Sequence, residues 1–428
     1  MRRPPLPGGP YLVLGLARSG SAAAAVLLAR GESVLGADRD ATRALPGVEL
    51  VDGLASLDRV GCVIKSPGVP REDAVVAAAR ARGLPVIGEL ELAWRLLAAE
   101  FVAVTGTNGK TTTVELLGAI HRAAGLGVAV AGNVGRAASG LVGALAADDV
   151  VVCEVSSFQL EDTIAFAPEA AALLNIAPDH LDRHIDMDDY VAAKLRLFEH
   201  QGPGDIAVLP AGGPAVVLTA RRVTFGSAAQ ADLRDDGQAL RWHEEPVIAN
   251  GEIRLRGAHN RENAMAAAAV ALARGIPASS VAEALATFAG VEHRLEEVAT
   301  IGGVLYVNDS KATNTASTVV ALRAFEPGRV HLILGGRGPG QDFGVLRDEI
   351  AARAKAVYLI GEEAPAIDAA LAGLGTAVDA GTLERALAAA RAAAAPGDVV
   401  LLSPACKSFD QFRDYEARGE AFRTLVRS

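Results

Sequence analysis

The feature that most constrains the fold is the stretch FVAVTGTNGKTTT at residues 101–113. An apolar strand, FVAVT, leads into a glycine-rich turn, and Gly-Lys-Thr then opens an apolar helix. The N–H groups of such a turn and the positive end of the helix together form a cradle for phosphate. The common phosphate loop has a glycine where this chain has Val104, so we expect a tighter loop. The stretch therefore predicts an α/β domain in which Lys110 reaches the outer phosphates and Thr111 holds Mg²⁺.

Strands and helices alternate through the rest of the chain, which is typical of α/β domains with mostly parallel sheets. Strands are expected at residues 11–14, 33–38, 62–69, 127–132, 149–155, 170–177, 330–336, 356–361 and 398–404. Residues 205–257 are interpreted as an antiparallel flank, residues 293–310 as a hairpin, and two helices are expected between the last two strands. We therefore predict three domains: a Rossmann-like domain at 1–96, a central ATPase domain at 97–291 and a Rossmann-like domain at 292–428.

Charge and cysteine content exclude several classes of function. The formal net charge is −10 and the sequence has no long basic run, which argues against a nucleic-acid partner. Arg18 interrupts the apolar N-terminal stretch, and 18 consecutive uncharged apolar residues occur nowhere, so neither a signal peptide nor a membrane span is expected. Cys62, Cys153 and Cys406 are widely spaced and form no CxxC pair, which favours a reducing, cytoplasmic location.

The N-terminal turn GLARSG at residues 15–20 resembles a dinucleotide-binding fingerprint. Ala17 stands where that fingerprint has its second glycine, and Asp38 lies 18 residues after Gly20, near the usual interval. The motif alone leaves two interpretations open, a nucleotide site or an ordinary βαβ turn. Only six of the 41 basic residues are lysines, so a retained lysine can mark a place that needs a compact ammonium or a reactive amine. For Lys355 we expect simple exposure, and the other five stay open.

Three further residues are candidates for catalysis. Glu154 ends an apolar strand next to the phosphate loop, where a carboxylate is placed to hold Mg²⁺. His180 follows the next strand, within the acidic segment around Asp179. Lys194 lies in a helix 14 residues further on, and two interpretations stay open for it. Its amine either faces solvent or is carbamylated by CO₂ into an anionic metal ligand, a change that arginine cannot undergo.

At this point a family resemblance becomes specific. TGTNGKTT, GNVG, EVSSFQLE, NIAPDHLDRH, AAKLRLF, GAHNRENAMAA, HRLE and NDSKATN occur in the order and approximate spacing of the Mur ligase family. The similarity spans essentially the whole chain, and the segment SPACKSFDQFRDYEARG resembles the members that add D-glutamate. The resemblance implies ADP-forming amide synthesis through an acyl-phosphate in peptidoglycan precursor synthesis. It implies UDP-N-acetylmuramoyl-L-alanine, D-glutamate and ATP as substrates, two Mg²⁺ ions and a carbamylated Lys194, in a monomeric enzyme.

The resemblance also implies roles for individual residues. Lys110, Glu154, His180 and Lys194 would be catalytic, and Thr111 would join the last three as metal ligands. The residues expected to bind ATP are Gly106, Asn108, Gly109, Lys110, Thr111, Thr112, Asn260, Asn263, Arg294 and Asp309. Those expected to bind the UDP substrate are Leu16, Ala17, Asp38, Arg39, Ser66, Gly68, Asn133, Ser156 and Gln159. Those expected to bind D-glutamate are Lys311, Thr313, Lys407, Ser408, Phe409 and Tyr415. Because ATP ligands come from two domains, we expect domain closure to assemble the site.

One position departs from the family pattern. The segment GGRGPGQDF at residues 335–343 has Pro339 where the family has a lysine that pairs with the D-glutamate side chain. Proline offers neither charge nor an N–H donor, so Arg337 or Lys407 is expected to supply the charge. The departure keeps open a ligase that adds a different amino acid. A nucleotide-dependent ATPase without ligase activity is a further alternative, whereas the N-terminal domain argues against a folylpolyglutamate synthase.

Overall fold

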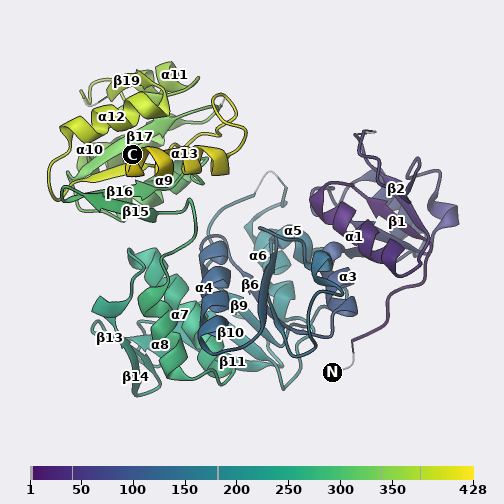
Figure 1. Ribbon diagram of the computed structural model, residues 1–428. Coiled ribbons are helices and arrows are strands. Elements are labelled where there is room, and N and C mark those ends of the chain that lie inside the picture. The colour runs from purple at the N-terminus through teal and green to yellow at the C-terminus, as the bar shows by residue number, and fades with distance from the viewer. Residues whose placement is uncertain (1–2, 41, 181–182, 339, 376) are drawn as a thin grey trace. The chain divides into compact units, whose positions relative to one another are not determined.

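The structure is a computed structural model that describes residues 3–40, 42–180, 183–338, 340–375 and 377–428 (Figure 1). Its contacts divide the chain into two compact units. The first unit contains Met1–Arg254 and His259–Phe288, and the second contains Leu255–Ala258 and Ala289–Ser428. Two of the three sheets lie in the first unit and the third lies in the second unit. Each sheet lies within the residue range of one predicted domain, and the exact domain boundaries stay a proposal.

The N-terminal sheet is parallel and has the strand order β3-β2-β1-β4-β5, as in half of a dinucleotide-binding fold. Its elements are β1 (Tyr11–Leu14), α1 (Arg18–Ala29), β2 (Val34–Ala37), β3 (Glu49–Leu50), β4 (Cys62–Lys65), α2 (Ala74–Ala81), β5 (Val86–Gly88) and α3 (Glu89–Leu96). The strands predicted at 11–14, 33–38 and 62–69 are confirmed, although the third ends at Lys65. Because β1 pairs with β2 and β4, the turns that follow these strands meet at one edge of the sheet.

The central sheet has the order β14-β13-β12-β11-β10-β9-β6-β8-β7. Its strands are β6 (Glu100–Thr105), β7 (Val128–Gly132), β8 (Val150–Glu154), β9 (Ala170–Leu173), β10 (Ile206–Pro210), β11 (Arg221–Gly226), β12 (Leu233–Asp235), β13 (Ala239–Trp242) and β14 (Glu245–Ala249). The helices between and after them are α4 (Lys110–Ala123), α5 (Ser157–Leu160), α6 (Met187–Leu195), α7 (Ala258–Ala273) and α8 (Ala278–Thr287). Val104 of β6 pairs with Glu154 of β8, which brings Glu154 beside the phosphate loop.

The prediction of an antiparallel flank at 205–257 is wrong for its first half. β10 pairs with both β9 and β11 in parallel, and β11 pairs with β12 in parallel. In this region only the pairs β12–β13 and β13–β14 are antiparallel. Buried Ala207 and Leu209 of β10 extend the same core that Phe101 and Val151 form on one face of the sheet. Burial in that core therefore favours the parallel pairing of β10 with its neighbours over the hairpins that the glycine turns had suggested.

The third sheet has the order β15-β16-β20-β17-β18-β19, in which β15 alone is antiparallel to its neighbour. Its strands are β15 (Glu296–Ile301), β16 (Val304–Asn308), β17 (Val330–Gly335), β18 (Ala354–Ile360), β19 (Ala377–Gly381) and β20 (Val399–Leu402). Its helices are α9 (Thr315–Arg323), α10 (Arg347–Arg353), α11 (Ala364–Ala370), α12 (Leu383–Ala393) and α13 (Tyr415–Arg427). The predicted hairpin is confirmed as β15 and β16, whereas β19, between the two helices α11 and α12, was not predicted.

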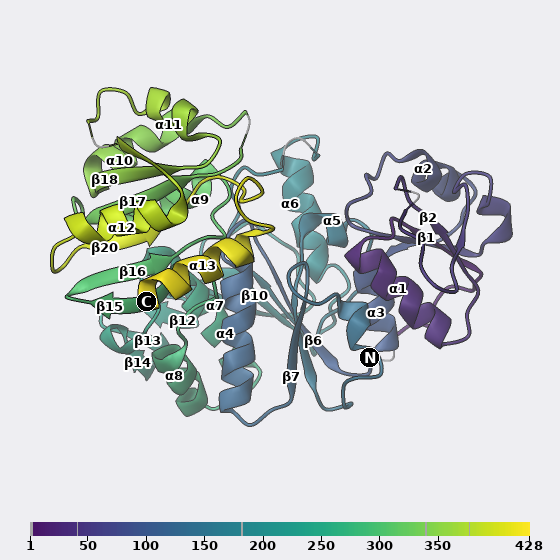
Figure 2. The same cartoon turned by 45° about the horizontal axis from the view of Figure 1, so that its top comes forward.

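Helices cover both faces of the third sheet (Figure 2). Leu387 of α12 and Phe422 of α13 pack on one face, and Leu322 of α9, Ile350 of α10 and Ile367 of α11 pack on the other. Short 3₁₀ turns complete the secondary structure at η1 (Leu57–Arg59), η2 (Ala138–Leu141), η3 (Arg196–Phe198), η4 (Asn250–Glu252) and η5 (Phe343–Leu346). In the part of the chain that the structure describes, no helix is both long and apolar enough to cross a membrane.

Candidate functional site

The loop between β6 and α4 has the backbone that phosphate binding requires. Gly106 and Gly109 have φ values of 153° and 85°, which favour glycine. A Cβ atom on Gly109 would lie 2.0 Å from Oδ1 of Asn263, so the close approach of α7 also excludes a side chain there. Lys110 Nζ donates to the carbonyl oxygens of Gly106 and Thr107, each at 2.9 Å. The loop is therefore closed by its own lysine. Its Gly109 lies against Asn263, a predicted ATP ligand of α7, and Asn263 Nδ2 donates to Oδ1 of a second predicted ATP ligand, Asn260, at 3.3 Å.

Glu154 lies at the same loop. The Thr111 hydroxyl donates to Glu154 Oε2 at 2.8 Å, and Asn133 Nδ2 donates to Glu154 Oε1 at 3.0 Å. Glu154 is 2% exposed, so these two hydrogen bonds hold a buried carboxylate at the end of β8. The structure thus brings together two of the predicted metal ligands and one predicted ligand of the UDP substrate. Thr112 is also buried in the first turn of α4, and Asn108 N–H donates to Asn175 Oδ1 at 2.9 Å.

Lys194 does not face solvent. It is 2% exposed, and its Nζ donates to the Gly106 carbonyl at 2.8 Å, the same oxygen that accepts from Lys110. Nζ also lies 4.5 Å from the ring centroid of Tyr190, one helical turn earlier in α6. Burial, and to a smaller extent the charge of Lys110, lower the pKa of Lys194 to about 7, whereas Asp179 acts in the opposite direction. The solvent-facing interpretation is therefore wrong, and the geometry gives a buried amine that is substantially neutral at neutral pH.

His180 is more exposed to solvent than Glu154 and Lys194. Its backbone has a φ of 54°, its side chain is 48% exposed, and Nε2 lies 3.4 Å from Asp179 Oδ2. The ring contacts Phe158 at 4.9 Å between centroids and Tyr190 at 6.5 Å. Tyr190 thus lies between His180 and Lys194 and also forms a hydrogen bond of 3.1 Å with the Thr107 hydroxyl. Sequence reasoning missed Tyr190, although its position four residues before Lys194 on a helix signals that the two share a face.

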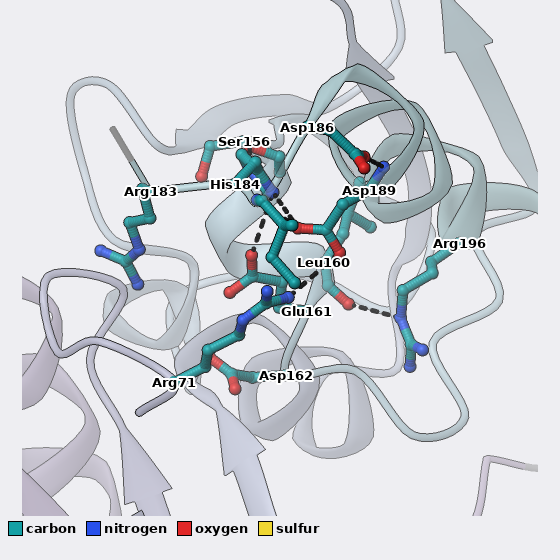
Figure 3. A network of polar contacts seen from close by, with 12 residues as sticks. Arg71, Ser156, Leu160, Glu161, Asp162, Arg183, His184, Asp186, Asp189 and Arg196 are labelled. Atoms are coloured by element: carbon teal, nitrogen blue, oxygen red, sulfur yellow. Dashed lines mark hydrogen bonds and ion pairs between the residues drawn. The ribbon is translucent and has the colours of Figure 1, made fainter. Parts of the chain in front are cut away.

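A polar network around His184, four residues after His180 in the chain, was also missed (Figure 3). His184 is buried, and its Nδ1 lies 3.2 Å from Asp189 Oδ2 and 3.5 Å from Glu161 Oε1, while Nε2 pairs with the Ser157 hydroxyl at 3.0 Å. Arg71 Nη1, from the turn after β4, donates to Asp189 Oδ1 at 3.1 Å. Asp189 also accepts from the Ile185 N–H at 3.2 Å, so it holds the segment that follows His180 through two contacts.

The described residues contain no group of three or more His, Cys, Asp and Glu side chains that could hold a metal. The predicted metal set does not require one, because it combines the Thr111 hydroxyl, the Glu154 carboxylate, the His180 imidazole and a modified lysine. Oxygen ligands are those that Mg²⁺ prefers, and the buried Thr111–Glu154 pair beside the phosphate loop fits this preference.

A pocket of about 880 Å³ opens at the edge of the N-terminal sheet, within the first unit. Of the residues predicted to bind the UDP substrate, its lining contains Ala17, Asp38, Arg39, Ser66, Gly68, Asn133 and Gln159. Leu16 and Ser156 are outside the lining. The Leu16 N–H donates to Asp38 Oδ2 at 2.5 Å, and Ser156 caps α5 through Gln159. Sequence reasoning missed two further lining residues, Arg18 and Arg43, whose positive charges suit an anionic ligand.

Asp38 is held as a carboxylate at this pocket. Burial alone would raise its pKa, but N–H donors from Asp40 and Leu16 and the charge of Arg43 outweigh burial and lower the pKa. Arg18 lies on the facing side, where its Nη2 donates to the Asn133 carbonyl at 3.1 Å. One acceptor and several guanidinium groups therefore line a single pocket, which suits a ligand that has both hydrogen-bond donors and negative charge.

The candidates of the second unit gather at the carboxyl ends of its strands. Asp309 follows β16, where Oδ2 accepts from the Ser403 hydroxyl at 2.8 Å and Oδ1 accepts from the Leu295 N–H at 3.2 Å. Burial raises the pKa of Asp309 to about 7, against the Ser403 hydrogen bond and the charge of Arg294. The Lys311 N–H donates to the His293 carbonyl at 3.0 Å, which joins this turn to the segment that carries Arg294.

The residues predicted for D-glutamate lie on two neighbouring segments. The Thr313 N–H donates to the Lys311 carbonyl at 2.9 Å, and Lys311 Nζ lies 5.9 Å from the ring centroid of Tyr415. Ser408 is buried, whereas Phe409 is 59% exposed. Sequence reasoning missed the residue that joins these segments, Arg418 of α13. It is 1% exposed, and its guanidinium donates to the Ser310 carbonyl at 2.8 Å and to the Cys406 carbonyl at 3.0 Å.

The two residues predicted to replace the missing lysine are neighbours. The Arg337 N–H donates to the Lys407 carbonyl at 2.8 Å, and the Lys407 N–H donates back to the Arg337 carbonyl at 2.9 Å. Arg337 Nε lies 3.4 Å from Glu362 Oε2, and both of these side chains are more than half exposed. Pro339 itself lies outside the described residues. The strand-like pairing places two exposed cations beside the segment in which the family has its lysine.

Comparisons with known proteins show which family the chain resembles. Family models described as "Mur ligase middle domain" and "Mur ligase, glutamate ligase domain" match residues 104–271 and 293–406. The chain is 44% identical to the UDP-N-acetylmuramoylalanine--D-glutamate ligase of Acidobacterium capsulatum, over 98% of this chain and 96% of that protein. It is also 44% identical to the enzyme of the same name from Anaeromyxobacter dehalogenans, over 100% of this chain and 99% of that protein.

Solved structures support the fold. The MurF ligase of Thermotoga maritima, in complex with ADP, matches with a TM-score of 0.62 at 16% identity, over 99% of this chain and 96% of that one. UDP-N-acetylmuramate-alanine ligase MurC from Thermotoga maritima matches with a TM-score of 0.61 at 19% identity, over 98% of this chain and 99% of that one. At such identities the likeness concerns the fold alone.

Proposed function

The chain belongs to the Mur ligase family, and from this premise we propose that it joins D-glutamate to the L-alanine carboxylate of UDP-N-acetylmuramoyl-L-alanine while ATP becomes ADP and phosphate. The acceptor carboxylate attacks the γ-phosphate of ATP to give an acyl-phosphate and ADP. The amine of D-glutamate then attacks the acyl carbon, loses a proton and displaces phosphate. The near-full-length identity to D-glutamate ligases favours this amino acid over the other additions known in the family.

The observation that carries the proposal is the convergence of Lys110, Lys194, Thr111 and Glu154 on one loop. Both lysines donate to the Gly106 carbonyl, and the Thr111–Glu154 pair lies on the adjacent strand end and helix start. Such a loop binds the phosphates of a nucleotide, and the positive charge of Lys110 would stabilise the charge that develops during phosphoryl transfer. Mg²⁺ at Thr111 and Glu154 would supply further neutralisation of the phosphate oxygens.

Lys194 is proposed to act as a carbamate. The neutral amine adds to CO₂: the nitrogen forms a bond to carbon, the nitrogen loses a proton, and the product carries a negative charge. Burial supports this role because it lowers the pKa of Lys194 to about 7 and leaves the nucleophilic form available. A carbamate would suit the second predicted metal position, together with His180. It would also reverse the charge repulsion between Lys194 and Lys110.

The pocket of the N-terminal sheet is proposed to hold the UDP part of the acceptor. Asp38 supplies an acceptor for donors on the ligand, and Arg18, Arg39 and Arg43 supply positive charge for the diphosphate. The proposal includes a cytoplasmic, monomeric enzyme, since the three cysteines are free and buried and the net charge is −10. Size-exclusion chromatography with light scattering tests the monomer.

The experiment that tests the function is ADP release with a panel of amino acids, each with and without UDP-N-acetylmuramoyl-L-alanine. We expect release that needs the acceptor and is fastest with D-glutamate. Release that is fastest with another amino acid would identify a different ligase of the family. Release that is independent of the acceptor would favour the nucleotide-dependent ATPase.

A second prediction concerns the charge that Pro339 lacks. Arg337 and Lys407 are paired through their backbones, so either side chain can reach a carboxylate bound beside this segment. Replacing the contacting residue by alanine should raise the KM for D-glutamate by about tenfold or more, because a charge-assisted hydrogen bond is lost. The KM for ATP should stay within about twofold. An unchanged KM for D-glutamate in Arg337→Ala, Lys407→Ala and the double variant would reject both residues.

A further inference from the structure

Lys65 is a buried charge that the proposed chemistry does not use. It is the last residue of β4 and is 0% exposed. Its Nζ donates to Asp162 Oδ2 at 2.5 Å, and the Asp162 side chain is 1% exposed. Two charges that leave water together are retained only where their geometry is good, and the removal of one leaves the other uncompensated. This pair joins residues 97 positions apart, from the N-terminal sheet and from the turn after α5.

Both partners of this pair adjoin the proposed UDP pocket without lining it. Ser66 and Gly68, directly after Lys65, line the pocket from the N-terminal sheet, and Gln159, three residues before Asp162, lines it from the central sheet. Ser66 is also fixed by its own bonds, since its N–H donates to the Leu14 carbonyl at 3.0 Å and its hydroxyl to the Gly15 carbonyl at 2.6 Å. The ion pair therefore connects two walls of one pocket.

The surroundings of Asp162 leave it little freedom. Its carbonyl accepts from the Gly88 N–H at 2.9 Å, and a Cβ atom on Gly88 would lie 3.2 Å from Asp162 Cβ. Arg80 Nη2 lies 3.5 Å from Asp162 Oδ1, but Arg80 is 46% exposed and is screened by solvent. Asp162 directly follows Glu161, whose carboxylate lies near His184 (Figure 3). Lys65 is the fully buried partner that holds the Asp162 carboxylate.

We infer that Lys65 and Asp162 form a positioning pair that fixes the two walls of the pocket at the separation that the UDP-linked acceptor requires. The inference rests on the proposed function for the identity of the ligand. A compact ammonium fits the enclosed position at the end of β4, whereas a guanidinium is larger and planar. This explains why a chain that otherwise prefers arginine has a lysine at this position.

The test is a double-mutant cycle of Lys65→Met, Asp162→Asn and the double variant in the full-length enzyme. We expect each single variant to raise the KM for UDP-N-acetylmuramoyl-L-alanine by about tenfold or more while kcat and the KM for ATP stay within about threefold. The double variant should be no worse than the poorer single variant, because both substitutions act on one interaction. Direct calorimetric binding of the acceptor without ATP should weaken by the same factor as the KM rises.

Lys355 provides the matched control. Its Nζ contacts buried Asp398 at 2.7 and 2.8 Å in the second unit. Lys355→Met should lower the melting temperature but leave the KM for the acceptor within about twofold. If Lys65→Met and Asp162→Asn also lowered only the melting temperature, the pair would be structural and the inference would be overturned. Additive effects in the cycle would overturn it as well.

Failure of the proposed function and failure of the positioning pair give different results. Asp162→Asn is nearly isosteric and is measured alone if Lys65→Met does not fold, with the same split between KM and kcat expected. If the wild-type enzyme released no ADP with the acceptor and D-glutamate, the proposed function would fail before any variant was compared. A wild-type enzyme that is active but whose variants keep the wild-type KM contradicts the positioning pair alone.

Discussion

Lys194 and Lys110 donate to the same carbonyl oxygen. Burial lowers the pKa of Lys194 to about 7, and the nearby charge of Lys110 acts in the same direction. The strand ends and helix start of an α/β unit predicted Lys110, Thr111 and Glu154 as parts of one site, whereas only the family resemblance added Lys194 to them. The sequence could not predict that Lys194 is buried, because an amphipathic helix pattern does not say how closely its edge approaches the phosphate loop.

Chemical rescue tests the carbamate. Lys194→Ala should lower kcat by about 100-fold or more, because an anionic ligand next to the transferred phosphoryl group is lost. Formate or acetate should restore part of that activity by occupying the space of the carbamate. Lys355→Ala serves as the control, since its lysine lies in the second unit at Asp398 and should neither lose activity nor respond to formate. Full activity of Lys194→Ala without added acid would contradict the role.

The lowered pKa of Lys194 also predicts a dependence of stability on pH. In the unfolded chain the amine titrates near its ordinary value of about 10.4, whereas the folded pKa is about 7. Between these values the unfolded state binds the proton that the folded state lacks, so the free energy of unfolding contributed by this group rises as pH rises. Urea unfolding at pH 7, 8 and 9, in CO₂-free buffer, should show a steeper rise for the wild type than for Lys194→Met. Parallel slopes would contradict the lowered pKa.

At the scale of elements, patterns of burial decided what could be predicted. β1, β8 and β17 are short, fully buried and mostly apolar strands, and the sequence predicted them within one residue at either end. β19 was missed because its sequence, AVDAG, includes two exposed positions and follows a glycine-rich turn. β10 and β11 were assigned to an antiparallel flank because neighbouring glycine turns suggested hairpins. Parallel pairing across the sheet depends on contacts distant in sequence, which a local pattern does not contain.

The phosphate loop and α4 offer a test with a built-in control. Alanine at Gly109 would have a φ of 85° and would place Cβ 2.0 Å from Asn263 Oδ1, so the loop or the Asn263 side chain must move. A displacement of about 1 Å at a phosphate site typically lowers kcat/KM by about 100-fold, which we expect here with ATP as the varied substrate. Gly125, at the other end of α4, has a φ of 72° and open space around it. Gly125→Ala should cost about 1 kcal/mol of stability and leave the KM for ATP unchanged. Equal effects of both variants on KM would contradict the loop assignment.

For the whole molecule, the sequence predicted three α/β domains, and the structure has three sheets in two compact units. The N-terminal and central sheets belong to one unit because buried groups join them, among them Lys65 with Asp162 and Glu89 with the Ser139 N–H at 2.5 Å. Alternating strands and helices predict the number of sheets, since each sheet needs its own run of strands. They cannot predict which sheets form one unit, because that depends on contacts distant in sequence, such as the packing of Leu90 and Trp94 of α3 in the core around Phe166.

The UDP pocket lies wholly within the first unit, which predicts where ligand binding stabilises the chain. Hydrogen exchange with and without UDP-N-acetylmuramoyl-L-alanine should show protection at residues 14–19, 37–40, 51–54 and 66–70, which line the pocket. At a ligand concentration of about 100 times Kd, binding adds about 2.7 kcal/mol to the free energy of unfolding of the folded unit that binds the ligand. In the absence of ATP and D-glutamate, exchange at residues 340–375 and 377–402 should not change. Protection confined to those residues of the second unit would contradict the assignment of the pocket. Asp38→Asn should reduce the protection of the pocket residues, because it removes the carboxylate charge and replaces one of two acceptor oxygens by an NH₂ donor.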